Sequence, residues 1–228
     1  MSKSSRWAIP PVRGGAFMGG GKGALSEAEV KGILQERSIH TTHFLVPHRQ
    51  DLGSLPLSFP VAVKASSPTI LHKTEVGGLY LDVRSHEDLV RKYDDLRSRF
   101  PGAEILVEPM EAEGPEVIVG LARDRDFGMS IMLGMGGVMA ELYKDASFRK
   151  LPISRMDAEE MLGETRASAF FEGFRGFRAD KVAMLDLLEK VSLLGQEYDG
   201  LEQLDLNPVI LRETGYVVVD AKMVLRGD

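Results

Sequence analysis

The chain has 228 residues, of which 43% are apolar and 27% are charged, a composition typical of a globular protein with a substantial core. Its net charge is −6 with acidic and basic residues interspersed, which argues against binding to nucleic acid, and the absence of cysteine excludes disulfides, thiolate metal sites and a cysteine nucleophile. We find neither a signal-peptide pattern nor an apolar run of membrane-spanning length, so we expect a cytoplasmic protein with no membrane partner.

Residues 1–24 are rich in glycine and proline and show no hydrophobic periodicity, which predicts a flexible N-terminal extension. The glycine run at residues 19–23 is not a P-loop. Ala16 occupies the position of the first glycine, Gly23 replaces the serine or threonine, and no strand precedes the run.

The next stretch begins with Ser26 and Glu29, which have the spacing of a capping box. The helix that they begin is expected to bury Val30, Ile33 and Leu34. Residues 41–46 are expected to form a strand. Three-residue spacing would then place the imidazoles of His40 and His43 on opposite faces, so a metal site at this position is not favoured.

Residues 60–78 begin as an apolar strand and continue as a polar loop that carries His72. Period two places the valines of the strand on one face and Lys64 on the other. A lysine on an apolar strand needs an anionic partner, and no acid lies beside Lys64 in the sequence, so an anionic ligand is expected. Gly77 and Gly78 would let backbone N–H groups approach that anion. The alternative, an edge-strand lysine before an ordinary hairpin, remains open.

The middle of the chain predicts a helix over residues 85–100, which Ser85 caps and Pro101 ends. The expected buried stripe of this helix is Leu89, Tyr93, Leu96 and Phe100. Strands follow at residues 105–107, 116–121 and 129–133. Three glycines within Gly134–Gly137 then indicate a close backbone approach to a ligand or to a neighbouring segment, or a plain glycine-rich turn.

The last part of the chain predicts two helices, at about residues 157–164 and 180–198, and a terminal hairpin. The second helix is expected to bury Val182, Leu185, Leu188, Val191 and Leu194. In the hairpin, Asp205 and Asn207 share a face, and the returning strand brings Asp220 beside Asn207. Rigidly held carboxylate and amide oxygens suit Mg²⁺, and the alternative is a set of surface acids on an exposed hairpin.

Several motifs occur in an order that resembles one known family. They are Phe59–Lys64, Ile70–Gly78, Glu116–Gly120, Asp126–Gly128, Gly134–Gly137, Glu141–Arg149 and Asp205–Pro208. From about residue 25 to its end, the chain resembles the ATP-grasp beta subunit of ADP-forming acyl-CoA synthetases, the family of acetate–CoA ligase (ADP-forming).

This resemblance implies an α/β (α+β) ATP-grasp fold with two lobes of mainly antiparallel sheet and helices, and with nucleotide bound between the lobes. The extension would cover residues 1–24 and the ATP-grasp domain residues 25–228. The first lobe would span about residues 25–110 and the second about residues 111–228.

The resemblance also implies the groups that bind nucleotide. Lys64 would contact the phosphates of ATP or ADP, together with the glycine-closed end of the loop. Glu108, Pro109 and Met110 would form the hinge against the adenine, and Glu116 would bind the ribose hydroxyls.

The implied catalytic group is His72, which resembles the phosphohistidine of the family's beta subunit. Lys73 would help to neutralise the transferred phosphoryl group, and Asp205 would lie close to it. Asn207 and Asp220 would hold Mg²⁺. A neutral imidazole is a good nucleophile and, once phosphorylated, a good leaving group, so transfer would run in both directions.

The reaction implied is acyl-CoA + ADP + phosphate ⇌ acid + CoA + ATP, a ligase reaction shared with a CoA-binding alpha subunit in an α2β2 heterotetramer. The chain departs from the family at residues 46–59, which look short where a helix is usual. The alternative function is a non-catalytic ATP-grasp protein that binds nucleotide as a regulatory or scaffolding partner. The acyl group, the choice of ATP or GTP, and the physiological direction are not specified by the sequence.

Overall fold

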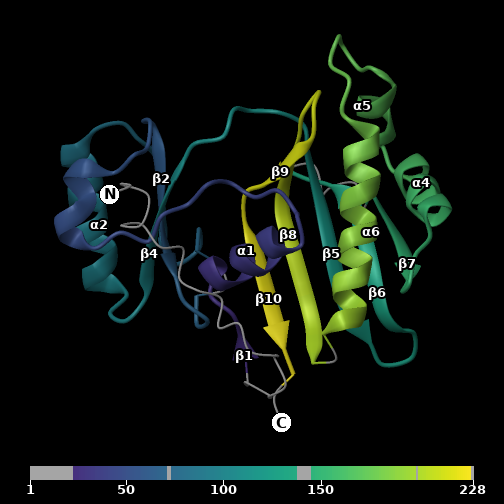
Figure 1. Cartoon of the computed structure of the whole chain (residues 1–228), viewed down its shortest axis with the longest axis horizontal. Coiled ribbons are helices and arrows are strands. Elements are labelled where there is room, and N and C mark those ends of the chain that lie inside the picture. Colours follow the sequence, from purple (N-terminus) through teal and green to yellow (C-terminus); the bar gives the residue numbers. More distant parts are fainter. Residues whose placement is uncertain (1–22, 71–72, 138–144, 199, 227–228) are drawn as a thin grey trace, which may run out of the picture. The chain divides into compact units, whose positions relative to one another are not determined.

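The computed structural model describes residues 23–70, 73–137, 145–198 and 200–226 (Figure 1). This described chain divides into two compact units. Unit 1 contains Ala24–Ile33 and Thr42–Ala112, and unit 2 contains Leu34–Thr41 and residues from Glu113 onward. The extension predicted over residues 1–24 lies almost wholly outside the described residues. The two lobes expected from the sequence stay a prediction.

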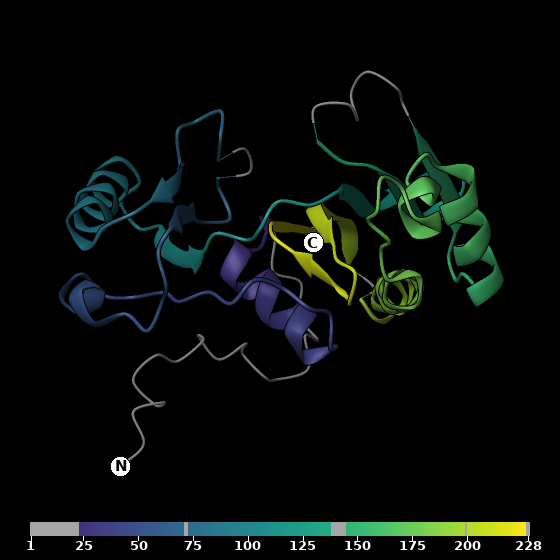
Figure 2. The same ribbon diagram turned by 90° about the horizontal axis from the view of Figure 1, so that it is seen from above.

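Among the described residues, unit 1 is built on an antiparallel sheet of three strands in the order β3–β2–β4. The strands are β2 (Val61–Ser66), β3 (Leu79–Val83) and β4 (Glu104–Pro109). Helix α2 (His86–Arg99) packs against one face of this sheet, and the short 3-10 helix η2 (Arg49–Ser54) packs beside α2. Figure 2 shows α2 and the helix α1 (Glu27–Glu36) on opposite sides of the small sheet.

The two faces of β2 differ as period two predicts. Val61 and Val63 are 1% and 0% exposed in the core that α2 covers. Lys64 lies on the other face, where Ala28 of α1 packs against Leu106 and forms a second cluster. Because alternate residues of a strand face opposite layers, one strand supplies both the apolar core and a row of polar groups.

The predicted helix starts are confirmed by their hydrogen bonds. At α1 the backbone N–H of Ser26 donates to Glu29 Oε2 at 2.9 Å, and the N–H of Glu29 donates to Ser26 Oγ at 3.3 Å. At α2 the hydroxyl of Ser85 accepts from the N–H of Asp88 at 3.2 Å. These bonds satisfy N–H groups that have no partner within the helix.

Unit 2 is built on the larger sheet, whose strands within the described residues have the order β1–β10–β8–β5–β6–β7, with β9 paired to β8. The pairs between β10, β8, β5, β6 and β7, and that of β9 with β8, are antiparallel. The strands are β1 (Gly23–Ala24), β5 (Glu116–Asp124), β6 (Gly128–Met135), β7 (Ala146–Lys150), β8 (Leu201–Leu211), β9 (Tyr216–Val218) and β10 (Ala221–Leu225).

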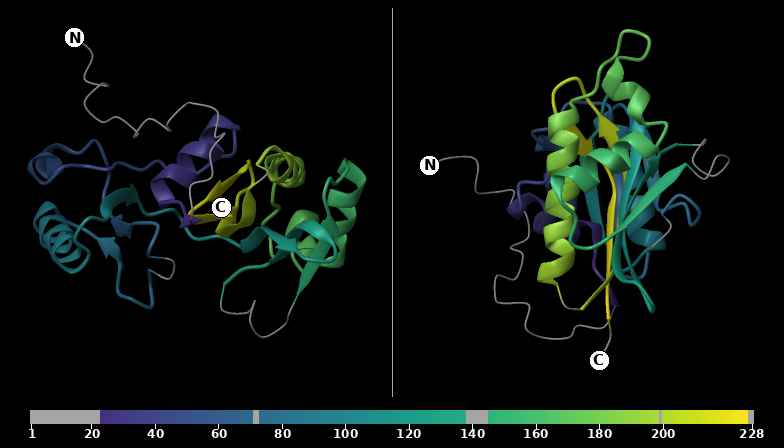
Figure 3. Two further views of the ribbon diagram at one scale, coloured as in Figure 1. Left: turned by 90° about the horizontal axis from the view of Figure 1, so that it is seen from below. Right: turned by 90° about the vertical axis from the view of Figure 1, so that its right-hand side faces the viewer.

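Helix α6 (Lys181–Glu197) lies along one face of this sheet, as both views in Figure 3 show. The helices α4 (Arg155–Glu164) and α5 (Ser168–Glu172) precede it in the chain, and α5 was not foreseen. The predicted stripe of α6 is buried except for Val182, which is 63% exposed. The buried face is centred near Met184 and Leu188, and a residue two positions before Met184 lies about half a turn away.

The prediction of a strand at residues 41–46 is wrong. Only isolated bridges form here, one from Thr41 to Val218 and one from Leu45 to Val107. Since the two ends of the segment pair with different sheets, no continuous ladder develops.

Within the described ranges, none of the helices combines the length and the apolar character needed to span a membrane. The cytoplasmic location expected from the sequence stays a prediction.

Candidate functional site

Unit 1 contains a buried cluster of charged and polar side chains, which we call the charge cluster. Each member is between 0% and 5% exposed. The members are Glu27, Lys31, Thr42, Lys64, Lys73 and Glu108. Burying so many ionised groups is costly unless they are paired, so their mutual geometry decides whether the arrangement is stable.

Three elements, the loop after β2, and the segment after α1 that contains Thr42 bring these side chains together. Helix α1 supplies Glu27 and Lys31, which are one helical turn apart on the same face. Strand β2 supplies Lys64, and β4 supplies Glu108. Glu108 pairs with Ala62 across the sheet, which places it on the same face as Lys64.

The ion pairs are close and share their acceptors. Lys31 Nζ lies 2.6 Å from Glu108 Oε2 and 2.7 Å from the hydroxyl of Thr42, which itself donates to Glu108 Oε2 at 2.8 Å. Lys64 Nζ lies 3.0 Å from Glu27 Oε1 and also pairs with Glu108 Oε1. Glu27 Oε1 is also 2.9 Å from Lys31 Nζ. Both glutamates therefore bridge lysines that come from different elements.

The loop after β2 joins the cluster through Lys73, whose Nζ lies 3.0 Å from Glu27 Oε2. Burial opposes ionisation of Glu27, but the nearby ammonium groups of Lys31, Lys64 and Lys73 outweigh it and hold the pKa of Glu27 well below its ordinary value. Glu27 is therefore a carboxylate on which three lysines converge.

The acid partners of Lys64 correct one step of the sequence analysis. The absence of an acid next to Lys64 in the sequence suggested that an anionic ligand must neutralise it, but the structure brings Glu27 and Glu108 to it from distant segments. Lys31 was missed altogether. The signal that points to it is a lysine set among Val30, Ile33 and the other apolar residues of α1. The contact of Lys64 with nucleotide phosphates stays a prediction.

The glycines that close the loop have partners within the loop. The N–H of Gly78 donates to the carbonyl of Lys73 at 2.6 Å, and the N–H of Gly77 donates to that of Thr74 at 3.2 Å. Gly77 adopts a φ of +66°, which side chains rarely tolerate. The expectation that these N–H groups point at an anion has no support in this arrangement, and a nucleotide-binding role for the two glycines stays a prediction.

The expected adenine hinge lies at the end of β4. The side chain of Glu108 points into the charge cluster, whereas Pro109 is half-buried and Met110 is 36% exposed. The N–H of Met110 donates to the carbonyl of Pro60 at 3.0 Å. The accessible groups of this segment are thus Pro109 and Met110, and their contact with adenine stays a prediction.

Unit 2 contains the expected metal ligands at one end of its terminal hairpin. Leu204 and Leu206 are 1% and 0% exposed, so Asp205 and Asn207 share the opposite face of β8, as predicted. The N–H of Asn207 donates to the carbonyl of Asp220 at 3.1 Å, so these two residues are neighbours.

The donors at this hairpin end suit a hard cation. The amide oxygen of Asn207 and the carboxylate of Asp220 are ligand types that Mg²⁺ accepts, with substrate phosphates and waters completing its shell. Within the described residues there is no group of three or more His, Cys, Asp or Glu side chains arranged to hold a metal by themselves. The residues therefore fit a metal held jointly with a phosphate-bearing ligand, and binding itself stays a prediction.

The glycines at the end of β6 approach a neighbouring segment, which decides between the alternatives left open by the sequence. The N–H of Gly136 donates to the carbonyl of Glu116 at 2.8 Å. A Cβ at Gly136 would lie 2.8 Å from the Cβ of Glu116 and 2.9 Å from its carbonyl carbon. The glycine thus fixes the start of β5, where Glu116, the expected ribose ligand, lies half-buried.

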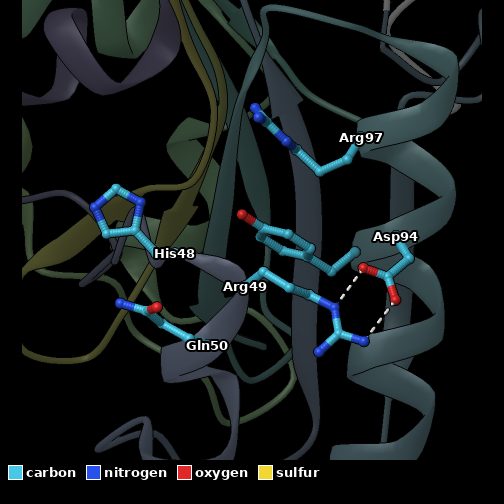
Figure 4. Close-up of a pocket in the computed structure, with 6 residues that line it drawn as sticks. His48, Arg49, Gln50, Asp94 and Arg97 are labelled. Carbon is cyan, nitrogen blue, oxygen red and sulfur yellow. Dashed lines mark hydrogen bonds and ion pairs between the residues drawn. The ribbon is translucent and has the colours of Figure 1, made fainter.

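A pocket of about 820 Å³ lies beside η2 and α2 in unit 1, and none of the predicted site residues lines it. Figure 4 shows the guanidinium of Arg49 facing the carboxylate of Asp94, with hydrogen bonds of 2.6 and 2.9 Å. The pocket is lined by His48, Arg49, Gln50, Tyr93, Asp94 and Arg97. Its lining residues come from the segment at residues 46–59, where the structure has the short helix η2, and from α2.

His72, the expected catalytic residue, lies outside the residues that the structure describes. The nearest described residue after it in the sequence is Lys73. The candidate site of unit 1 is therefore the charge cluster with the loop residues from Lys73 to Gly78.

Comparison with known families and proteins gives a consistent result. A family model described as an ATP-grasp domain matches residues 16–225. The beta subunit of acetate–CoA ligase (ADP-forming) II from Pyrococcus furiosus is 37% identical, over 91% of this chain and 94% of that subunit. Acetate–CoA ligase (ADP-forming) II from Archaeoglobus fulgidus is 38% identical over 88% of this chain, and the match spans 30% of that longer protein.

Two solved structures share the fold over most of their length. A structure of the dinucleotide forming acetyl-coenzyme A synthetase 1 of Ca. Korarchaeum cryptofilum has a TM-score of 0.78 and 37% identity, over 89% of this chain and 93% of that chain. That structure holds coenzyme A and Mg-AMPPCP, with its phosphohistidine segment pointing towards the nucleotide binding site. PH1788 from Pyrococcus horikoshii has a TM-score of 0.83 and 32% identity, over 91% of this chain and 93% of that chain.

Proposed function

This chain belongs to the ATP-grasp family that includes the beta subunits of ADP-forming acetate–CoA ligases, and on that premise we propose that it is the nucleotide-binding subunit of an ADP-forming acyl-CoA synthetase. It binds Mg-nucleotide and relays a phosphoryl group through His72. The complete reaction is acyl-CoA + ADP + phosphate ⇌ acid + CoA + ATP.

The observation that carries this proposal is the shared carboxylate of Glu27. The ammonium groups of Lys64 and Lys73 both lie 3.0 Å from this carboxylate, one on each oxygen. The lysine expected to contact the nucleotide phosphates and the lysine that follows His72 in the sequence are thereby held at one place in unit 1. The cluster as a whole holds three ammonium groups against two carboxylates, so a phosphoryl group that reaches it meets a net positive charge, which favours transfer through a charged transition state.

The step assigned to this chain is one reversible phosphoryl transfer between the nucleotide and His72. In the direction that consumes ATP, an imidazole nitrogen of His72 attacks the γ-phosphorus, a P–N bond forms, and the bond to the bridging oxygen breaks, so that ADP leaves with the electron pair. In the other direction ADP attacks the phosphohistidine and releases the imidazole. Mg²⁺, held by Asn207 and Asp220, would neutralise charge on the phosphate oxygens.

The chain acts with a partner in this proposal. It is close in length to the separate beta subunit from Pyrococcus furiosus, of which it covers 94%, but matches only 30% of the longer Archaeoglobus fulgidus protein. We therefore assign acyl-CoA binding to an alpha subunit, and we retain the α2β2 assembly as part of the proposal.

The test is phosphorylation of the chain, alone and after assembly with its CoA-binding alpha subunit. Incubation with γ-labelled ATP and Mg²⁺ should give an acid-labile, base-stable label at His72, located by mass spectrometry. His72→Ala should remove the label but leave nucleotide affinity nearly unchanged, because the imidazole takes part in transfer and not in holding adenine or ribose. His43→Ala, an exposed histidine outside the loop, is the matched control.

Two outcomes would contradict the proposal in different ways. If the assembled complex forms ATP from acyl-CoA but His72 carries no label, the chain is part of the enzyme and His72 is not the phosphoryl carrier. Nucleotide binding without label or ATP formation in the assembled complex would instead favour the non-catalytic regulatory protein.

A further inference from the structure

The segment that follows His72 is attached to helix α2 at its far end. Arg99, in the last turn of α2, donates from Nη2 to the carbonyl of Val76 at 2.8 Å and from Nη1 to the carbonyl of Gly77 at 2.9 Å. Two consecutive carbonyls are thus held by the two arms of one guanidinium. Because the guanidinium is planar and its donors are fixed, this pair of hydrogen bonds sets both the position and the direction of the backbone at Val76 and Gly77.

Arg99 is itself oriented by two side chains. Its Nη1 also lies 3.2 Å from Asp95 Oδ2, one helical turn earlier, and the hydroxyl of Tyr80 donates to the same oxygen at 2.7 Å. The hydrogen bond from Tyr80, and after it the one from Arg99, lower the pKa of Asp95, so the carboxylate stays ionised. Tyr80 lies on β3, directly after the loop, so the loop end, the strand and the helix are joined by one hydrogen-bonded set.

Gly77 is suited to its contact with Arg99 in two respects. Its φ of +66° favours glycine, and a Cβ added there would lie 2.7 Å from Arg99 Nη2. A side chain at position 77 is therefore disfavoured for two reasons: it would collide with Arg99, and the backbone conformation favours glycine. The pair Gly77–Arg99 explains the glycine without any ligand.

We infer that Arg99 is a positioning residue for the phosphoryl relay. It fixes residues 76 and 77 to α2, so that the segment that follows His72 in the sequence has a constant anchor point. At the other end of this segment Lys73 is held by Glu27. The inference rests on the proposed function, and nothing in it requires Arg99 to touch the nucleotide or the phosphoryl group.

The test uses the chain assembled with its alpha subunit and compares Arg99→Ala, Arg99→Lys and Arg91→Ala. Arg91 is the matched control, because it lies on the same helix and pairs with Asp88 of that helix at 2.6 Å. Three quantities are measured: the rate of labelling at His72 with saturating nucleotide, the nucleotide dissociation constant, and the hydrogen exchange of the Gly77 and Gly78 amides.

Loss of two charge-assisted hydrogen bonds in Arg99→Ala should slow labelling about tenfold or more, speed exchange at both glycines, and leave nucleotide affinity unchanged. Arg99→Lys should recover part of the rate, since one ammonium reaches the carbonyls without the fork. Added guanidinium ion at millimolar concentration should partly restore Arg99→Ala, because the site is open to solvent. Arg91→Ala should behave like the unmodified chain.

Labelling of Arg99→Ala at the rate of Arg91→Ala would overturn the inference, whatever the exchange data show. Gly77→Ala supplies a second test, because its added methyl group displaces Arg99. Its effect on labelling should shrink in the Arg99→Ala background, and full additivity would contradict the coupling. Failure of the unmodified complex to label His72 would be a failure of the proposed function, and the exchange data would then still report whether Arg99 holds the loop end.

Discussion

At the scale of single residues, Glu27 is the group on which the charges of unit 1 converge. It belongs to the first turn of α1, where a carboxylate is favoured by the helix dipole. Its two oxygens lie 3.0 Å from Lys64 and Lys73 respectively, and Lys31 approaches one of them at 2.9 Å. Removing one carboxylate from such a site leaves buried ammonium groups with fewer partners, which costs more than the pair itself contributes.

We predict that Glu27→Gln lowers the free energy of unfolding by about 3–5 kcal/mol at pH 7, the usual cost of breaking a buried ion pair. The pKa of Glu27 is depressed in the folded chain, so its stabilising contribution is present above the ordinary glutamate pKa of about 4.3 and is lost as the pH falls through the lower, folded value. The free energy of unfolding should therefore fall less in Glu27→Gln than in the unmodified chain as the pH is lowered through the acid range. Urea unfolding at a series of pH values measures both effects.

Glu36→Gln is the control for this experiment, because Glu36 is an exposed acid at the other end of α1. Its effect should stay within about 0.5 kcal/mol. Equal stability loss in the two variants, or an unchanged acid profile in Glu27→Gln, would show that the cluster does not depend on this carboxylate.

At the scale of elements, close backbone contacts at glycine set the ends of the strands. Gly136 lets the end of β6 lie against Glu116 at the start of β5, and Gly134 lies where a Cβ would be 3.0 Å from the carbonyl of Asp145. The obstructing atoms at Gly136 are mostly backbone, which cannot move without shifting a strand. The glycine-rich motif is therefore a packing requirement of this sheet edge.

Gly136→Ala should destabilise the chain by about 1–3 kcal/mol, because the added methyl group would overlap the backbone of Glu116. It should also weaken nucleotide binding if Glu116 holds the ribose, since the start of β5 would move. Thermal unfolding and nucleotide titration measure these two effects.

Gly163→Ala is the matched control, because Gly163 lies near the end of α4 with nothing within 4 Å of the added methyl group. Replacing a helical glycine by alanine at an open position should be neutral or stabilise by up to about 1 kcal/mol. A neutral effect of Gly136→Ala would mean that the two strands adjust freely at this edge.

At the scale of the whole molecule, the predicted ligands are divided between the two units. Lys64 and Glu108 meet in the charge cluster of unit 1, and Asn207 and Asp220 meet at the hairpin end of unit 2. Lys64 and Glu108 lie on strands β2 and β4, whereas Asn207 lies on β8 and Asp220 lies between β9 and β10. A nucleotide that binds the folded chain and not the unfolded chain stabilises the fold by mass action.

Mg-ADP or Mg-ATP at 100 times its dissociation constant should add about 2.7 kcal/mol to the stability of the chain. The double variant Asn207→Ala with Asp220→Ala should lose the part of this gain that requires Mg²⁺. The shift of the unfolding temperature, with and without metal, measures it.

Glu202→Ala serves as the control, since Glu202 lies on the same strand as Asn207 and pairs with Arg226 at 2.7 Å. This variant should retain the full metal-dependent shift. An unfolding temperature that does not respond to saturating Mg-nucleotide in the unmodified chain would contradict nucleotide binding, for the enzyme and for the regulatory alternative alike.

The sequence by itself determined the features that depend on near neighbours along the chain. The alternation of Val63 and Lys64 on β2, the shared face of Asp205 and Asn207, and the caps of α1 and α2 all follow from local periodicity and short-range hydrogen bonds. The order of the motifs indicated the family, which the comparisons confirm. The site roles carried by that resemblance remain predictions.

Only the tertiary structure decided which groups neutralise one another. Lys64 pairs with Glu27 and Glu108, although these residues are far apart in the sequence. Arg99 likewise donates to the carbonyls of Val76 and Gly77. The expectation for residues 41–46 failed for a similar reason, since strand formation depends on a partner sheet that local composition does not specify. Ion pairs and ladders form between segments that packing brings together, and a buried charge is stable only where that packing supplies its counter-charge.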